Sequence, residues 1–213
     1  MSSIISVHSF RGGTGKSNLT ANLTCSMAAR GFRVGVIDTD IQSPGIHVLF
    51  RLQPASVKYS LNDFLHGRCQ IEEAAIDVTP SLSYANPPLP EGGTVYLIPS
   101  SIQTGEIARI LSDGYDVGLL NDGIQQVIQR LDLDFLFIDT HPGVNEETLL
   151  SIAISDMLFL VLRPDRQDFQ GTSVTVELAR QLDVKDMYMV LNMVLDVMDP
   201  DALRERPESI FWI

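Results

Sequence analysis

The sequence predicts an α/β fold of three layers, in which a mostly parallel sheet is covered by helices on both faces. Two observations support this fold class. Short apolar runs alternate with helix-length segments along the chain, and several of these runs are apolar at nearly every position. The alternation indicates βαβ units. Continuous apolar runs are typical of strands that are covered on both faces, as the strands of parallel sheets are.

The expected strands are short and almost free of polar residues. Ile4–His8 runs directly into a glycine-rich loop, and Arg33–Asp38 (RVGVID) follows after one helix-length segment. Phe135–Asp139 (FLFID) is apolar until its last residue. These lengths are typical of strands in globular proteins. The further expected strands are Val95–Ile98, Met157–Leu162 and Met187–Asn192.

Helices are expected between these strands. Leu19, Leu23 and Met27 recur at helical spacing within Ser17–Arg30, and a glycine follows. Thr79–Gly93 is rich in Pro, Gly and Ser, which predicts a long surface loop. The further expected helices are Ser60–His66, Gln70–Ala75, Gly105–Leu111, Gly118–Leu131, Glu146–Ser155 and Gln170–Leu182.

Composition limits the class of protein. The 213 residues suffice for one substantial domain, and no apolar run reaches the roughly 20 residues of a membrane span. The start lacks the basic region of a signal peptide. The two cysteines, Cys25 and Cys69, are far apart, so a disulfide framework, a zinc ribbon or an iron–sulfur ligand set is not expected. The sequence therefore predicts a reduced, cytoplasmic protein. Its net charge of -12 disfavours DNA as a general partner, although a local basic patch would permit contact.

The glycine-rich loop carries the strongest functional signal. The chain reads SFRGGTGKSN from Ser9 to Asn18, and Phe10 stands where the standard phosphate-loop pattern has its first glycine. Glycines let backbone N–H groups turn toward phosphate oxygens, and the N-terminus of the next helix adds partial positive charge. The alternative is a glycine-rich turn with a surface lysine. The expected phosphate-binding residues are Gly12, Gly13, Thr14, Gly15, Lys16, Ser17 and Asn18.

Three acidic residues follow buried strands. A carboxylate at the end of such a strand, as at Asp38 and Asp139, is costly unless it meets a metal or hydrogen-bond donors. Asp40 would point to the same side as Asp38 if the strand geometry persists. These acids suit a Mg²⁺ shell and a base that positions water, with Asp40 as a turn cap being the alternative. His141 is either a base or metal ligand or an ordinary loop histidine.

These motifs together resemble the MinD/ParA family of deviant Walker A P-loop ATPases. The matching segments are Arg11–Ser17, Asp38–Asp40 and Asp139–Gly143, and their order and spacing agree with the family across about residues 4–195. The resemblance implies a P-loop NTPase-like fold with ATP and Mg²⁺ as cofactors. The chain is then expected to be a single nucleotide-binding domain over residues 1–213, with a C-terminal end that is short relative to the family.

The resemblance also implies individual roles. Lys16 would be the ordinary loop lysine and would reach the β- and γ-phosphates, and Ser17 would be a direct Mg²⁺ ligand. Asp38 and Asp139 would belong to the outer shell of that ion. Asp40 would orient the attacking water. Asn192 matches a family position that contacts adenine.

Arg11 departs from the family pattern. The family loop reads K-G-G-x-G-K-[ST], and its first lysine crosses a dimer interface to the partner's ATP. Arg11 occupies this place. The resemblance therefore implies a catalytic cation aimed at a second subunit's phosphates, in the manner of an arginine finger. The alternative is that Arg11 pairs only with a local carboxylate.

The expected function follows from this resemblance. It is an ATP-dependent dimerisation switch: a weak ATPase that forms a homodimer, is stimulated by a partner protein, and positions or segregates a cargo. The alternative is a regulatory module that binds nucleotide and sequesters a partner with negligible turnover. Retention of all three acids favours hydrolysis. Membrane binding is not expected, because Pro207 interrupts the C-terminal segment and no lysine follows Lys185.

Overall fold

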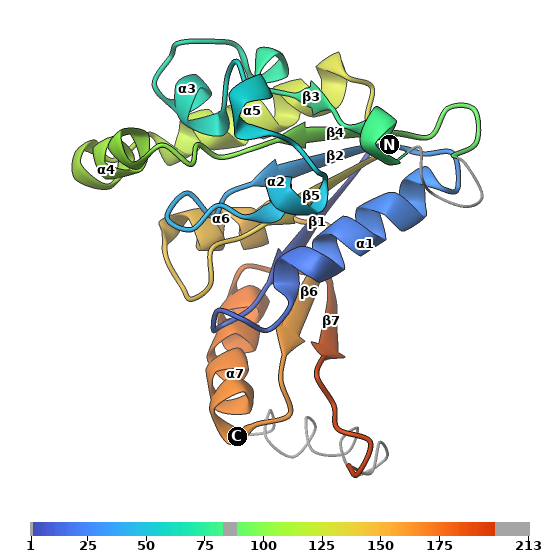
Figure 1. Ribbon diagram of the computed structural model, residues 1–213. Helices are drawn as coiled ribbons and strands as arrows, with labels where there is room; N and C mark the ends of the chain where they lie inside the picture. The colour runs from blue at the N-terminus through green and yellow to red at the C-terminus, as the bar shows by residue number, and fades with distance from the viewer. Residues whose placement is uncertain (1, 83–88, 199–213) are drawn as a thin grey trace.

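The computed structural model describes residues 2–82 and 89–198. Its centre is a seven-stranded sheet in the order β3-β4-β2-β5-β1-β6-β7 (Figure 1). Every neighbouring pair is parallel except β3 and β4, which are antiparallel. The predicted fold class, a P-loop NTPase-like α/β fold with a mostly parallel sheet, is confirmed. The strands are β1 (Ser3–His8), β2 (Arg33–Asp38), β3 (Ile76–Asp77), β4 (Thr94–Ile98), β5 (Phe135–Asp139), β6 (Met157–Leu162) and β7 (Asp186–Leu191).

Some of the helices begin after residues whose side chains satisfy free backbone N–H groups. Asp116, Asn145 and Asp165 each accept a hydrogen bond from the first turn of the helix that they precede. The helices are α1 (Lys16–Ala28), α2 (Ile46–Leu49), α3 (Leu61–Leu65), α4 (Thr104–Asp113), α5 (Val117–Arg130), α6 (Glu146–Ala153) and α7 (Arg166–Gln181). Short 3-10 helices are η1 (Pro54–Ser56), η2 (Ile71–Glu73) and η3 (Thr79–Leu82).

The sheet buries both of its faces. On one face, Val34 and Val36 of β2 join a core cluster with residues of α1 and α2, and Figure 1 shows α1 crossing in front of the strands. On the other face, Ile37 joins a cluster with residues of α3, α4 and α5. Helix α7 packs on this second face, against β6. Successive side chains of one strand therefore enter opposite cores, which explains why the strand sequences lack polar alternation.

Most of the predicted elements lie within a few residues of their expected bounds. The prediction of a helix at Gln70–Ala75 was wrong in type, because only one 3-10 turn forms there. The predicted loop Thr79–Gly93 begins with η3. The two-residue strand β3 and the four-residue helix α2 were not predicted, since elements this short show no periodicity. The C-terminal segment around Pro207 lies outside the described residues.

The parallel register sets the position of the functional site. Asp38 at the end of β2 lies opposite Asp139 at the end of β5, and the Thr39 N–H donates to the Asp139 carbonyl at 3.0 Å. The loop after β1 lies at the same edge, because β1 is the other neighbour of β5. In parallel α/β sheets this carboxyl edge is where ligands bind. No helix in the described part of the chain is long and apolar enough to cross a membrane.

Candidate functional site

The glycine-rich loop joins β1 to α1. Gly13 and Gly15 have φ values of +77° and +92°, which side chains other than glycine rarely adopt. Gly15 is also the residue before the first turn of α1, so the N-terminus of this helix faces the loop. The loop borders a pocket of about 200 Å³. This pocket is lined by Ser9, Gly12, Gly13, Gly15, Lys16, Ser17, Asn18, Asp40 and Pro142.

Lys16 and Asp139 form a buried ion pair below this loop. The Lys16 ammonium donates to Asp139 Oδ1 at 2.7 Å, and both side chains are almost fully enclosed. The Thr20 hydroxyl donates to the same oxygen at 3.3 Å. A buried charge is tolerable only when it is paired and hydrogen-bonded. The pair therefore keeps a cation next to the loop while it neutralises the acid at the end of β5.

Asp38 is a fully buried carboxylate with spare acceptor capacity. Its Oδ1 accepts the Asp40 N–H at 3.0 Å, whereas Oδ2 has no partner among the described residues. Burial and the neighbouring charge of Asp139 raise the pKa of Asp38 well above its ordinary value. An unpartnered oxygen in such a place fits a cation, which would offset the cost of burying the charge.

No group of three or more His, Cys, Asp or Glu side chains in residues 2–82 and 89–198 could hold a metal ion. Magnesium is commonly held by one or two carboxylates together with water and substrate phosphates. The pair Asp38 and Asp139, with the Ser17 hydroxyl bordering the pocket, fits that mode of binding.

Asp40 reaches the pocket from a turn rather than from a strand. Strand β2 ends at Asp38, so the expected continuation of strand geometry does not occur. Asp40 Oδ1 accepts the Ser43 N–H at 3.1 Å, which makes it a turn cap, and the side chain also lines the pocket. His141 Nε2 lies 3.9 Å from this carboxylate. Burial raises the pKa of Asp40.

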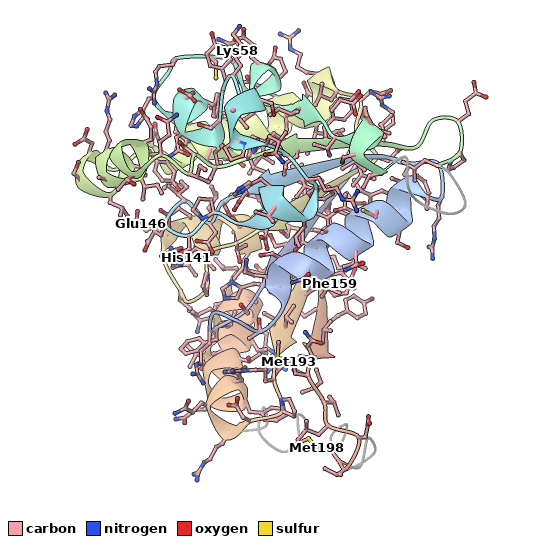
Figure 2. All side chains as sticks on the ribbon, in the orientation of Figure 1. Lys58, His141, Glu146, Phe159, Met193 and Met198 are labelled. Atoms are coloured by element: carbon pink, nitrogen blue, oxygen red, sulfur yellow. The ribbon has the colours of Figure 1, made fainter. Side chains whose placement is uncertain are left out.

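His141 follows β5 in the loop toward α6, and Figure 2 labels it near Glu146 on the carboxyl side of the sheet. Its Nδ1 is buried without a partner among the described residues. His141, for which the sequence allows a base, a metal ligand or an ordinary loop histidine, therefore lies beside the acid that is expected to orient water.

Arg11 lies against α7. Its Nη1 donates to Gln167 Oε1 at 2.7 Å and to Asp168 Oδ1 at 3.5 Å. The side chain is 42% exposed, whereas that of Asp168 is 2% exposed. The contacts within this chain therefore match the alternative in which Arg11 pairs with a local carboxylate. The guanidinium remains partly open to solvent.

Asn192 connects the end of β7 to the glycine loop. Its Nδ2 donates to the Thr14 carbonyl at 2.8 Å, and its backbone N–H donates to the Leu162 carbonyl at 2.9 Å. A Cβ on Gly15 would overlap the Asn192 amide and displace it from its hydrogen bond, and the positive φ of Gly15 also favours glycine at this position. In these contacts Asn192 supports the loop. Ser17 is half-buried and Asn18 is exposed.

Sequence reasoning missed His8, the last residue of β1. Its Nδ1 is 2.8 Å from the Thr140 hydroxyl, and its Nε2 is buried without a partner among the described residues. Burial, followed by the charge of Lys16, lowers the pKa of His8 to about 3, so the imidazole is neutral at pH 7. The missed signal was that a strand ends on a histidine directly before the glycine loop.

The chain matches the family model described as AAA domain over residues 2–193. It is 26% identical over 196 residues to the uncharacterized ATP-binding protein MJ0547 of Methanocaldococcus jannaschii, an alignment that covers 91% of this chain and 65% of that protein. It is 25% identical over 204 residues to the flagellum site-determining protein YlxH of Helicobacter pylori, covering 95% of this chain and 62% of that protein. The chain thus spans less than two thirds of these relatives.

The fold is also similar to a solved structure. The MinD cell division protein of Aquifex aeolicus superposes with a TM-score of 0.77 at 20% identity. The match covers 99% of this chain and 78% of that one. At this identity the likeness shows the fold, and the fold is compatible with many chemistries.

Proposed function

We propose that the chain, which belongs to the family described as AAA domain, is an ATPase of the MinD/ParA type that binds Mg·ATP and hydrolyses it slowly within an ATP-dependent homodimer. One observation carries this proposal. The glycine loop, the Lys16 ammonium and the carboxylates of Asp38, Asp40 and Asp139 meet at one edge of the sheet. The proposed unit is the whole chain, acting as one nucleotide-binding domain.

The loop would hold the phosphates of ATP. Gly13 and Gly15 have positive φ and line the pocket, and α1 begins directly after them. Such a loop would offer backbone N–H groups and the helix N-terminus to the phosphates. Lys16 would leave Asp139 for the β- and γ-phosphates. Bound Mg²⁺ would neutralise negative charge on these phosphates and on Asp38 and Asp139, and Ser17 would be its direct protein ligand.

Asp40 would orient the attacking water and accept its proton. Its place in the pocket and its raised pKa suit a general base, because catalysis improves as the pKa approaches the working pH. His141 lies 3.9 Å from this carboxylate, too far for a direct hydrogen bond, and would act on it electrostatically. The presence of Asp40 in the lining of the pocket favours hydrolysis over the alternative, a module that sequesters a partner without turnover.

Arg11 would supply a cation to the phosphates of the other subunit. Two ATP-loaded subunits that face each other bring like charges together, and a cation from each side offsets this repulsion. The name of the relative YlxH supports a role in site determination. We therefore propose that the dimer positions or segregates a cargo and that a partner protein stimulates hydrolysis.

The experiment that tests this function combines binding and turnover on one preparation of the chain. ATP affinity with and without Mg²⁺, phosphate release and sedimentation are measured together, and then again with DNA or liposomes added. Tight Mg·ATP binding with slow phosphate release supports a switch. Binding without any phosphate release, even in the dimer, would favour the sequestering module instead.

A further inference from the structure

The guanidinium of Arg11 is held by one of its three nitrogens. Nη1 donates to both Gln167 Oε1 and Asp168 Oδ1, while Nε and Nη2 have no hydrogen-bond partner among the described residues. The side chain is 42% exposed. Nη1 of the guanidinium is therefore fixed to α7, and the N–H donors of Nε and Nη2 remain available to another group.

The two residues that hold Arg11 are themselves rigidly placed. Gln167 and Asp168 lie in the first turn of α7, and the Asp165 side chain accepts hydrogen bonds from both of their N–H groups, at 3.0 and 2.9 Å. The helix N-terminus also favours an acid at this point. The anchor is thus part of a regular helix and does not depend on loop geometry.

Asp168 does not need Arg11 for its own neutralisation. Arg163 donates to Asp168 Oδ2 from its backbone N–H at 2.9 Å and from Nε at 3.0 Å, and to Oδ1 from Nη2 at 3.3 Å. Burial acts to raise the pKa of Asp168, but the hydrogen bonds and charge of Arg163 outweigh it and the pKa is lowered. Arg11 therefore contacts a carboxylate that is already satisfied.

The residue before Arg11 also lies on α7. A Cβ built on Gly171 would overlap the ring of Phe10, so this glycine leaves the space that the ring occupies. Phe10 stands where the standard loop pattern has a glycine. Phe10 and Arg11, which precede the double glycine, therefore both contact α7, so the start of the loop is fixed to this helix.

We infer that Gln167 and Asp168 position Arg11 by holding Nη1, so that Nε and Nη2 are presented to the phosphate of a second copy of this chain. The inference rests on the proposed function. It explains the use of arginine at this position. A lysine carries all its donors on one atom, so Gln167, the Asp168 carboxylate and the phosphate would all have to approach that single atom. In the guanidinium, Nη1 can bind Gln167 and Asp168 while Nε and Nη2 bind the phosphate.

The test is a double-mutant cycle on the full chain. Sedimentation velocity gives the ATP concentration at which half of the chain is dimeric, with Mg²⁺ present. Gln167→Ala should raise this concentration at least about tenfold, as expected for the loss of one hydrogen bond to a charged group. In an Arg11→Lys background the same change should have an effect of less than about twofold, because a lysine cannot hold anchor and phosphate together.

Gln170→Ala is the matched control, since Gln170 is an exposed glutamine on the same helix. It should leave the dimer midpoint unchanged. Binding of a fluorescent ATP analogue to the dilute monomer and the thermal midpoint should also be unchanged in Gln167→Ala. A merely structural role of Gln167 would alter the thermal midpoint and would affect both backgrounds equally.

Three outcomes would overturn the inference, and they separate it from the proposed function. If Gln167→Ala dimerises normally and Arg11→Ala does not dimerise, Gln167 does not position Arg11, while the proposed function of the chain is still supported. A lower ATP requirement in Gln167→Ala would show that α7 restrains Arg11. Normal dimerisation of both variants would contradict the interface role of Arg11 itself.

Discussion

The Lys16 ammonium lies 2.7 Å from the Asp139 carboxylate, and both side chains are nearly inaccessible to solvent. The pair joins the first residue of α1 to the last residue of β5. Asp38 lies opposite Asp139 in the sheet register, so one buried lysine faces two buried acids. The same residue thus serves the stability of the chain and, as we propose, the binding of ATP.

Lys16→Ala should abolish Mg·ATP binding, because the loop loses the only side-chain cation among the residues that line its pocket in the described structure. The change also leaves Asp139 buried without its charged partner, which costs about 3–5 kcal/mol of stability. Lys16→Gln keeps a donor for Asp139 and should fold better while still failing to bind. Isothermal titration calorimetry measures binding, and Lys58→Ala, at an exposed lysine, is the control. Wild-type affinity in a folded Lys16→Gln chain would contradict the proposed role.

Asp40→Ala should bind ATP nearly as well as the wild type but release phosphate about a hundredfold more slowly, since general-base assistance is lost. It should also accumulate the ATP-bound dimer. Single-turnover phosphate release is the measurement, and Asp122→Asn, at an exposed acid on α5, is the control. If Asp40→Ala turns over like the wild type, this residue only caps the turn at Ser43.

His8 should make the chain sensitive to acid. Its pKa is about 3 in the folded state against 6.5 for an ordinary histidine, so the unfolded chain binds the proton first. Stability is therefore lost as the pH falls through this window, by up to about 1.4 kcal/mol per pH unit. The raised pKa of Asp38 acts in the opposite sense, so the effect is read as a difference from His8→Asn.

Urea unfolding of both chains at several pH values between about 7.5 and 5 gives that difference. The wild type should lose stability relative to His8→Asn on acidification. Parallel pH profiles for the two chains would mean that the folded protein takes up a proton on His8 as readily as the unfolded one.

The sequence allowed prediction of the parts of this fold that carry a long pattern. Strand β2 and strands β5 and β6 have their predicted bounds because they are continuous apolar runs between turn signals. The end of β2 at Asp38 and the turn that follows it depend on the hydrogen bonds of Asp38 and Asp40, which no periodicity reveals. Element β3 exists only through its pairing with β4.

The candidate site was predictable as a set of motifs but not as a set of contacts. Lys16, Asp38 and Asp139 are marked by their places at the loop and at strand ends. The contact of Arg11 with Gln167 joins residues 156 positions apart, and that of Asn192 with Thr14 joins residues 178 apart. Such pairs follow from how β7 and α7 are placed beside β1, which the spacing of motifs does not specify.

Sedimentation of the wild type and of Arg11→Ala, each without nucleotide, with Mg·ADP and with Mg·ATP, measures whether the ATP-dependent dimer requires Arg11. Arg109→Ala, at an exposed arginine of α4, is the control. We expect a dimer only for the wild type and Arg109→Ala in Mg·ATP. Arg11→Ala should bind ATP as a monomer, because it lacks the cation for the second subunit's phosphates. An Arg11→Ala chain that dimerises with Mg·ATP like the wild type would show that Arg11 does not act on the phosphates of the second subunit.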